Sequence, residues 1–271
     1  MIRSLLKLSR PKHWLKNILV FIPIIYAQKI FDIEMLFSNF LAFIAFCLIS
    51  SAVYVINDLA DAEKDKLHPI KHMRPIAAGL IGKRQAVIFA VLLLIGGFVL
   101  FCNIYLFLYV LLNLAYSFKL KHIVLIDCFC IAGGFMLRIL AGGAAGDAVI
   151  SEWLFLTMIT ASLFMAFGKR RGEILHTASE SRKVLASYNE DYLHGMIFVC
   201  SGLSIVFYSL WSMTVSYMIY TVPLVIYIIA KYLLVCHDTA SHGDPISIIL
   251  ADKVLIIAIG GLGLLSIVLL Y

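Results

Sequence analysis

The sequence predicts an all-α polytopic membrane protein with nine transmembrane helices in one domain, residues 1–271. The first observation is composition: 62% of the 271 residues are hydrophobic and only 14% are charged, with a mean hydropathy of +0.99. A soluble domain of this length needs far more charge to cover its surface. Second, several apolar runs approach the roughly 20 residues that a helix needs to cross a bilayer. Third, no stretch alternates apolar and polar residues as barrel strands do.

Each span is predicted from an apolar run, with ends placed to within a few residues. The first run lacks the cleavage pattern of a signal peptide, so we expect it to be retained as a helix. The predicted spans are about 16–31, 37–57, 86–102, 104–118, 123–145, 153–168, 193–211, 213–233 and 254–270.

The distribution of basic residues predicts the orientation. Of the 22 Lys and Arg, 20 lie in the N-terminal segment or in the loops of one side, whereas Lys29 falls on the other side and Arg138 inside a span. This asymmetry places the N-terminus and the long loops in the cytoplasm, and an odd number of spans then leaves Tyr271 outside. We expect a bacterial inner membrane. The net charge of +6 therefore reflects topology and anionic lipid rather than nucleic acid.

Two charged residues fall inside the predicted span 123–145. Asp127 and Arg138 are eleven residues apart, which is close to three helical turns. Charges inside a span are functional by default, but Arg138 lies toward the outer half, so we favour a structural pair or a contact that faces the bundle. The glycines of this span indicate close helix packing: Gly133, Gly134, Gly142 and Gly143.

The segment "NDLADAEKDKLHPIKHMRP", residues 57–75, concentrates four acidic and four basic residues between apolar runs. Asn57, Asp61 and Asp65 are spaced i, i+4, i+8, and Asp58 is three before Asp61, so a continued helix places all four on one face at the cytoplasmic mouth. Clustered carboxylates repel unless a cation lies between them, and hard oxygen ligands suit Mg²⁺. The alternative is a solvated loop whose acids are interleaved with lysines.

The cations that follow favour a phosphate-binding site. Lys64, Lys71 and Arg74 lie close in sequence to the carboxylates. Carboxylates that hold Mg²⁺ beside Lys and Arg form a clamp for a diphosphate, because the metal takes some oxygens and the cations take others. Pro69 and Pro75 break the helix and shape the loop.

The same segment resembles the first Asp-rich motif of the UbiA-type intramembrane prenyltransferase superfamily, NDxxDxxxD followed by RP and small residues. The resemblance extends over essentially the whole chain. It implies Mg²⁺ as cofactor and nine helices around a central cavity open to the cytoplasmic side, with active-site loops at about 58–85 and 169–191. The matching motif positions are Asn57, Asp58, Asp61, Asp65, Arg74 and Pro75.

The second loop departs from the superfamily pattern, in which a second motif, DxxxD, is expected. Instead, "KRRGEILHTASESRKVLASYNED" is similar to the decaprenyl-phosphate phosphoribosyltransferase branch, whose loop reads KRxxE followed by RxxLxxY. The N-terminal "RPKHWLKN" also resembles that branch, which starts RPxxWxKN. The matching positions are Lys169, Arg170, Glu173, Arg182, Leu185 and Tyr188 in the loop, and Arg10, Pro11, Trp14, Lys16 and Asn17 at the start.

The branch implies transfer of 5-phosphoribosyl from phosphoribosyl pyrophosphate to a polyprenyl phosphate, with release of diphosphate. One carboxylate motif then serves one diphosphate, and cations of the second loop serve the other phosphates, for which the planar fork of Arg is suited. The implied metal ligands are Asn57, Asp61 and Asp65; the implied catalytic residues are Asp58, Asp61, Lys71 and Arg74; the implied substrate-binding residues are Lys16, Tyr54, Lys64, Lys119, Lys169, Arg170, Glu173, Arg182 and Tyr188.

Several of these residues have plainer alternative roles. Lys16 and Lys119 are also expected as anchors at the membrane surface, Arg170 as a topology signal, and Tyr188 as an interfacial aromatic residue.

Two other functions of the protein stay open. One is a conventional prenyltransferase acting on an aromatic or quinone-precursor acceptor. The other is a transporter for an anionic metabolite, which predicts interrupted helices in matching halves. The sequence leaves open the polyprenyl length and the oligomeric state, including a homo-oligomer.

Overall fold

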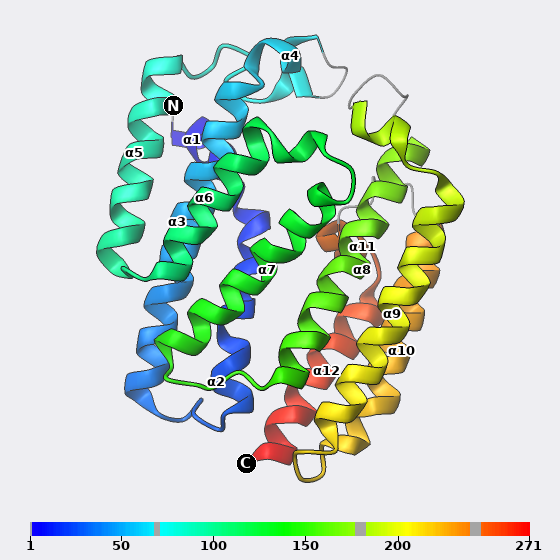
Figure 1. Cartoon of the computed structure of the whole chain (residues 1–271). Helices are drawn as coiled ribbons and strands as arrows, with labels where there is room; N and C mark the ends of the chain where they lie inside the picture. Colours follow the sequence, from blue (N-terminus) through cyan, green and yellow to red (C-terminus); the bar gives the residue numbers. More distant parts are fainter. Residues whose placement is uncertain (1, 68–70, 177–182, 239–244) are drawn as a thin grey trace. The chain divides into compact units, whose positions relative to one another are not determined.

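Every regular element that the structure describes is a helix (Figure 1). The structure, a computed structural model, describes residues 2–67, 71–176, 183–238 and 245–271. The α-helices are α1 (Ile2–Ser9), α2 (Ile22–Tyr26), α3 (Ile33–Ala60), α4 (Ala62–Lys66), α5 (Lys83–Leu100), α6 (Ile104–Phe118), α7 (Ile126–Ala145), α8 (Glu152–His176), α9 (Glu190–Ser212), α10 (Val222–Asp238), α11 (Pro245–Ala251) and α12 (Lys253–Leu270); the 3₁₀ segments are Pro11–Phe21, Lys71–Met73, Leu120–His122, Lys183–Ser187 and Met218–Thr221.

Six helical segments of the described residues are long and apolar enough to cross a membrane, which makes the protein a polytopic membrane protein. Helix α6 coincides with the predicted span 104–118, but its 15 residues reach only about 22 Å. That is less than the roughly 30 Å of a hydrocarbon core. Helix α8 covers the predicted span 153–168, but it is not among the six segments that are long and apolar enough. The six are Ile33–Ala60, Lys83–Leu100, Ile126–Ala145, Glu190–Ser212, Met218–Cys236 and Lys253–Leu270.

The prediction of one continuous helix over 16–31 is wrong. The chain there forms a 3₁₀ segment, Pro11–Phe21, and then the short helix α2, after which Gln28 adopts a left-handed backbone with φ of 57°. Pro23 has no backbone N–H, so an α-helix running through it would lose a hydrogen bond. The helical stretch therefore begins earlier than predicted, changes from 3₁₀ to α at Ile22 and ends at Tyr26, and its 3₁₀ part packs against α3.

The chain divides into two compact units, and helix α7 contributes its first half to one and its second half to the other. Each unit has its own apolar interior, and each is described by itself below. Unit 1 consists of residues 1–24, 29–118 and 137–148, and unit 2 of residues 25–28, 119–136 and 149–271.

The long helix α3 is the centre of unit 1, where α1, α5, α6 and the 3₁₀ segment Pro11–Phe21 pack against it. Two glycines permit close approach. A Cβ atom at Gly97 of α5 would lie 2.5 Å from the side chain of Ile49, and one at Gly142 of α7 would lie 1.9 Å from the carbonyl oxygen of Val20. The close packing predicted at Gly142 is therefore confirmed. The absence of a side chain at Gly142 lets the backbone of the 3₁₀ segment Pro11–Phe21 contact α7 directly.

Unit 2 is built mainly from helices α8 to α12, among which α8 packs along α9 and α10 contacts both α9 and α12. Its buried cluster joins Phe164 and Phe167 of α8 to Leu193 of α9 and Leu255 of α12. Tyr188, in the connection that precedes α9, belongs to the same cluster and is 7% exposed. The second predicted loop is thus anchored to the interior of this unit.

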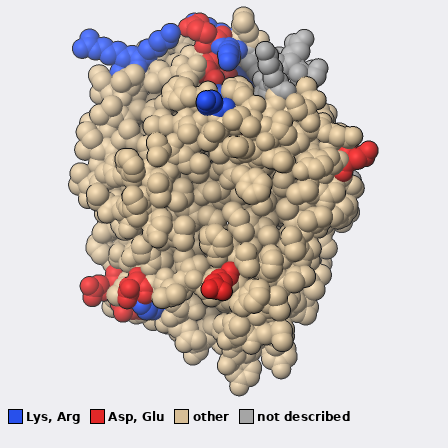
Figure 2. Space-filling model, in the orientation of Figure 1, with Lys and Arg blue, Asp and Glu red and all other residues tan. Residues whose placement is uncertain are grey.

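The surface of the helices is apolar along most of its length. On the face drawn in Figure 2, charged side chains gather mainly in the upper and lower parts of the view, and other residues form most of the surface between them. Large apolar side chains point outward from the spans, including Val99, which is 78% exposed, and Ile257, which is 72% exposed. A soluble protein rarely exposes so much contiguous apolar surface, whereas lipid covers it in a bilayer.

Candidate functional site

The carboxylates of segment 57–75 lie on a nearly continuous helical path. Helix α3 ends at Ala60, and α4 begins two residues later. The backbone N–H of Asp61 donates to the carbonyl oxygen of Asn57 at 3.0 Å, and that of Asp65 donates to Asp61 at 2.9 Å. The predicted continuation of the helix past Asn57 is therefore confirmed. Asp58 and Asp65, two turns apart, lie on the same side, and both are buried, at 3% and 4% exposed.

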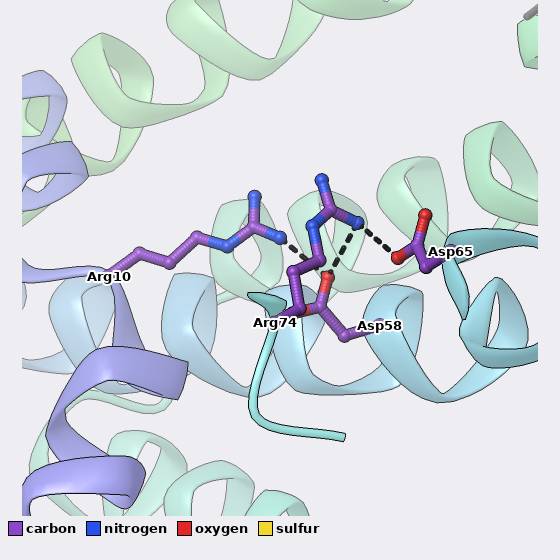
Figure 3. A network of polar contacts seen from close by, with 4 residues as sticks. All are labelled: Arg10, Asp58, Asp65 and Arg74. Carbon is purple, nitrogen blue, oxygen red and sulfur yellow. Dashed lines mark hydrogen bonds and ion pairs between the residues drawn. The ribbon is translucent and has the colours of Figure 1, made fainter. Parts of the chain in front are cut away.

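Two arginines meet these two carboxylates (Figure 3). Nη2 of Arg10 lies 2.5 Å from Oδ1 of Asp58. Nη1 of Arg74 lies 3.1 Å from the same oxygen and 2.6 Å from Oδ2 of Asp65. The two aspartates are thus bridged by one guanidinium, and Asp58 accepts from a second. We call these four residues the Arg–Asp cluster.

Arg10 reaches the cluster because of an unusual backbone turn. It links α1 to the 3₁₀ segment Pro11–Phe21 with φ of 50° and ψ of 61°, a left-handed conformation that is uncommon for a residue with a side chain. Its guanidinium carbon lies 4.9 Å from the ring centroid of Tyr54 on α3. Nε1 of Trp14 donates to Oγ of Ser51 at 3.0 Å, and that hydroxyl donates to the carbonyl oxygen of Ser9 at 2.9 Å. These contacts hold the turn against α3.

Arg74 is presented by a loop whose following residues are buried. Pro75 and Ile76 are buried directly after it, and Ile76 packs with Leu8, Val55 and other residues in a small core cluster. The loop closes through a hydrogen bond from the N–H of Leu80 to the carbonyl oxygen of Pro75, at 2.9 Å. The backbone is left-handed at Gly79, where φ is 71°.

The other predicted residues of unit 1 lie around this cluster at different degrees of burial. Asn57, Asp61, Lys71 and Lys16 are half-buried, and Lys64 is exposed. Tyr54 lies beneath the guanidinium of Arg10. Arg10 itself was missed as a site residue, although the motif "RPKHWLKN" contains it. No sequence rule couples that motif to an aspartate 48 residues later.

The acidic side chains of the cluster have suitable chemistry for a divalent cation. Within the described ranges, no group of three or more His, Cys, Asp or Glu is assembled around a common point. The oxygens of Asp58 and Asp65 nevertheless converge on one nitrogen of Arg74, so a positive charge already lies between them. Hard carboxylate oxygens around a cation position are the donors that Mg²⁺ prefers.

Unit 2 holds a second ion-pair cluster, centred on Arg170 of α8. Its Nε lies 2.6 Å from Oδ2 of Asp127 on α7, and its Nη1 pairs with Oε2 of Glu173 one turn later. Arg170 and Asp127 are both 0% exposed. The next residue, Arg171, pairs instead with Glu190 at 3.1 Å, where the carboxylate is 48% exposed. The guanidinium of Arg170 is thus paired with two carboxylates, and its full burial leaves no N–H group exposed to a phosphate in this arrangement.

Tyr188 completes this second cluster. Its hydroxyl donates to Oδ1 of Asp127 at 2.6 Å and accepts from the N–H of Leu125 at 2.8 Å. Leu125 has a left-handed backbone with φ of 68°, so Tyr188 stabilises an unfavourable turn at the start of α7. Burial and the hydrogen bond to Asp127 raise the pKa of Tyr188 above its ordinary value. The side chain therefore stays a neutral donor at physiological pH.

Asp127 and Arg138 take separate partners instead of forming the predicted structural pair. Asp127 belongs to the Arg170 cluster. Arg138 donates from Nε to Oδ1 of Asn17 at 2.7 Å and from Nη2 to the hydroxyl of Tyr109 at 2.8 Å. The alternative, a contact that faces the bundle, describes both residues better. Asp127 was missed as a partner of the second loop, although a carboxylate inside a predicted span signals such a role.

The remaining predicted residues of unit 2 are placed as follows. Lys169 is half-buried on α8, and Lys119 is exposed at the end of α6. Arg182 lies outside the described residues.

We expect Tyr188→Phe to destabilise the protein by roughly 1–3 kcal/mol, because Asp127 and the N–H of Leu125 each lose a buried partner. The measurement is thermal unfolding of the purified protein in detergent. Tyr192→Phe is the control, since Tyr192 is 44% exposed, and it should leave the transition unchanged. If Tyr188→Phe and Tyr192→Phe unfold at the same temperature, the hydrogen bonds of the Tyr188 hydroxyl do not stabilise the protein.

The chain resembles known proteins along most of its length. A model described as the UbiA prenyltransferase family matches residues 18–246. The chain is 38% identical to the decaprenyl-phosphate phosphoribosyltransferase of Corynebacterium glutamicum, with 93% of this chain and 82% of that protein covered. It is 35% identical to the same-named protein of Mycolicibacterium smegmatis, with 94% and 88% covered.

The fold agrees with this relationship. A solved structure of a UbiA homologue from Archaeoglobus fulgidus bound to DMAPP and Mg²⁺ superposes with a TM-score of 0.75 at 18% identity, covering 98% of this chain and 100% of that chain. The family model, the relatives and the helical architecture point the same way, and the chain belongs to the UbiA prenyltransferase family.

Proposed function

We propose that this protein is a membrane transferase that moves 5-phosphoribosyl from phosphoribosyl pyrophosphate to a polyprenyl phosphate and releases diphosphate. The observation that carries the proposal is the identity of 38% with a decaprenyl-phosphate phosphoribosyltransferase over 93% of the chain. The basic run Lys169–Arg170–Arg171, at the place where a second acidic motif is usual, supports it.

The proposed reaction requires few chemical groups from the protein. An oxygen of the lipid phosphate attacks C1 of the ribose, the bond from C1 to the diphosphate oxygen breaks, and the electron pair leaves with the diphosphate. A phosphate nucleophile is already ionised at pH 7, so no general base is needed. The work of the protein is to position the two substrates and to stabilise negative charge on the leaving group.

The residues of unit 1 would serve the diphosphate. Asn57, Asp61 and Asp65, with Asp58 beside them, would hold Mg²⁺, which when bound neutralises charge on the leaving oxygens. Lys71 and Arg74 would contact the diphosphate, since a bidentate guanidinium–phosphate bond is strong and directional. Lys64 and Tyr54 would border the site, and Lys16 would meet the lipid phosphate.

The residues of unit 2 would serve the remaining phosphates and the sugar. Lys169 and Arg182 are proposed phosphate contacts, and Lys119 is a proposed substrate contact. Glu173 would orient Arg170 through the ion pair described above. Because Arg170 is fully buried, we assign it a positioning role, in which it fixes Asp127 and thereby Tyr188.

We further propose that the chain forms a single domain over residues 1–271, with nine spans around a central cavity open to the cytoplasmic side. In a bacterial inner membrane, the N-terminus would lie in the cytoplasm and Tyr271 outside. A reporter fused to each end tests the orientation, because the two ends should report opposite sides.

The proposed function is tested by incubating membranes that contain the protein with ¹⁴C-labelled phosphoribosyl pyrophosphate, polyprenyl phosphate and Mg²⁺. We expect a labelled lipid that forms only when all three are present. EDTA should abolish it, and excess unlabelled donor should dilute it. No labelled lipid from active membranes would reject the proposal.

Two further arms test the alternatives. A prenyl diphosphate with an aromatic acceptor should yield no product, whereas product there would indicate a conventional prenyltransferase. Vesicles reconstituted with the protein should not accumulate labelled phosphoribosyl pyrophosphate, as an anionic-metabolite transporter would.

A further inference from the structure

We propose that Arg10 is a further residue of the diphosphate site, and that with Arg74 it acts as an internal counter-ion. In this inference, the two guanidinium groups hold Asp58 and Asp65 as ion pairs until a diphosphate is present. They then turn to the phosphate oxygens and leave the carboxylates to the metal. The inference deepens the proposed function and rests on it.

The placement of Arg10 supports a role beyond packing. Its left-handed backbone is of the strained kind that persists only where the surroundings hold it, and such strain clusters at functional sites. The hydrogen bonds from Trp14 and Ser51 hold this turn, and the ring of Tyr54 supports the guanidinium. Its side chain is also 25% exposed beside a carboxylate that is 3% exposed. The guanidinium can therefore swing toward solvent while Asp58 cannot.

The geometry makes metal and guanidinium compete. Oδ1 of Asp58 accepts from Arg10 at 2.5 Å and from Arg74 at 3.1 Å. A metal ion bound to that oxygen must displace at least one of these donors and would lie beside two positive charges. A diphosphate removes the conflict, because its oxygens accept from the displaced guanidinium groups and also ligate the metal. Metal and diphosphate should therefore bind with positive coupling, each raising the affinity for the other.

A plainer role for Arg10 is to tie the N-terminal segment to α3 through its ion pair with Asp58. The two roles predict opposite results in the absence of diphosphate. A structural tie, once removed, loosens the site and weakens metal binding or leaves it unchanged. An internal counter-ion, once removed, frees a buried carboxylate oxygen and strengthens metal binding.

The decisive experiment measures Mn²⁺ binding to the purified full-length protein in nanodiscs, with free Mn²⁺ followed by electron paramagnetic resonance. No lipid substrate or turnover is needed. We expect Arg10→Gln to tighten Mn²⁺ binding roughly 10-fold in the absence of diphosphate, because one adjacent positive charge is removed at an incompletely screened site. Arg10→Lys, which keeps the charge, should stay within about threefold of wild type by the same reasoning.

A matched control separates the local effect from a general change of charge. Arg3 is exposed and carries the same charge in α1, the helix that directly precedes Arg10. Arg3→Gln should change Mn²⁺ affinity less than twofold, because exposed charges are screened within about 10 Å. Adding Asp58→Asn to Arg10→Gln should remove the gain, which locates the tightened site at Asp58.

Inorganic diphosphate provides the second arm, with a protein-free titration to subtract its own Mn²⁺ complex. In wild type, diphosphate should raise Mn²⁺ affinity. In Arg10→Gln this gain should shrink, because part of the competition is already gone. Unchanged or weaker Mn²⁺ binding by Arg10→Gln would overturn the inference. Should that variant not fold, wild-type binding that shows no coupling to diphosphate would overturn it equally.

The experiments can reject the counter-ion role of Arg10 and the proposed function independently of each other. A protein that makes the labelled lipid but shows no effect of Arg10→Gln on Mn²⁺ binding keeps the proposed function and loses the counter-ion role. A protein that shows the Mn²⁺ effect without making the lipid keeps a diphosphate–metal site of this design and loses the assigned substrates.

Discussion

Asp58→Asn is expected to lower kcat/KM by at least roughly 1,000-fold, which corresponds to about 4 kcal/mol of lost transition-state stabilisation. The amide has nearly the shape of the carboxylate and keeps one oxygen that can accept from Arg10 and Arg74, but it has no negative charge and only one oxygen to offer a metal ion. The variant should still fold, because both arginine side chains are partly exposed, at 25% and 28%, and water can solvate them. Initial rates with labelled donor and thermal unfolding check the two statements.

Glu63→Gln is the matched control for this prediction. It makes the same change of charge five residues later, on a side chain that is 67% exposed and pairs with Lys66 and Lys83. Exposed pairs of this kind contribute little, so activity should stay within about twofold of wild type. If Asp58→Asn retains more than a tenth of wild-type activity, the Arg–Asp cluster is not the diphosphate site.

Arg170→Met is expected to destabilise the protein by roughly 3–5 kcal/mol, because it leaves Asp127 as a buried charge without its ion-pair partner. Little of the variant should elute as a monodisperse peak in detergent, and its thermal transition should fall well below that of wild type. Arg171→Met is the control. Its partner Glu190 is half-exposed, at 48%, so the loss should be no more than about 1 kcal/mol.

A double variant separates positioning from phosphate binding at Arg170. Adding Asp127→Asn to Arg170→Met removes the orphaned charge but keeps an oxygen that can accept from Tyr188. Replacing both members of a buried ion pair often restores stability. If Arg170 only positions its neighbours, the double variant should recover activity together with stability. A stable but inactive double variant would show that the guanidinium itself contacts substrate.

Local patterns predicted the parts of the structure that depend on local interactions. An apolar run identified α6 to the residue. Asn57, Asp61 and Asp65 are spaced i, i+4, i+8, and Asp58 is three before Asp61, which predicted that Asp58 and Asp65 share one side of the helical path, because helix periodicity determines which residues share a face. The first span could not be predicted as the structure has it. Its hydropathy is that of a span, but the chain there is a 3₁₀ segment that passes directly into the short helix α2 and ends at Tyr26.

The partners of the charged residues could not be predicted, since they come from distant parts of the chain. Arg10 lies 48 residues before Asp58, and Arg170 lies 43 residues after Asp127. The basic run Lys169–Arg170–Arg171 is typical of a topology signal. Its sequence is the same whether or not one of the three side chains is buried. Only packing shows that Arg170 turns inward while Arg171 pairs at the surface.

The contacts of Arg138 with Asn17 and Tyr109 have a consequence for how the protein is made. An arginine inside a span is costly to insert into the membrane, by up to about 2.5–3.5 kcal/mol at the helix centre. Asn17 is synthesised 121 residues earlier and Tyr109 29 residues earlier, so both hydrogen-bond partners already exist when α7 emerges. The nascent N-terminal segment can thus act as an intramolecular chaperone for α7. Removing it should cause newly made α7 to insert poorly and the chain to be degraded.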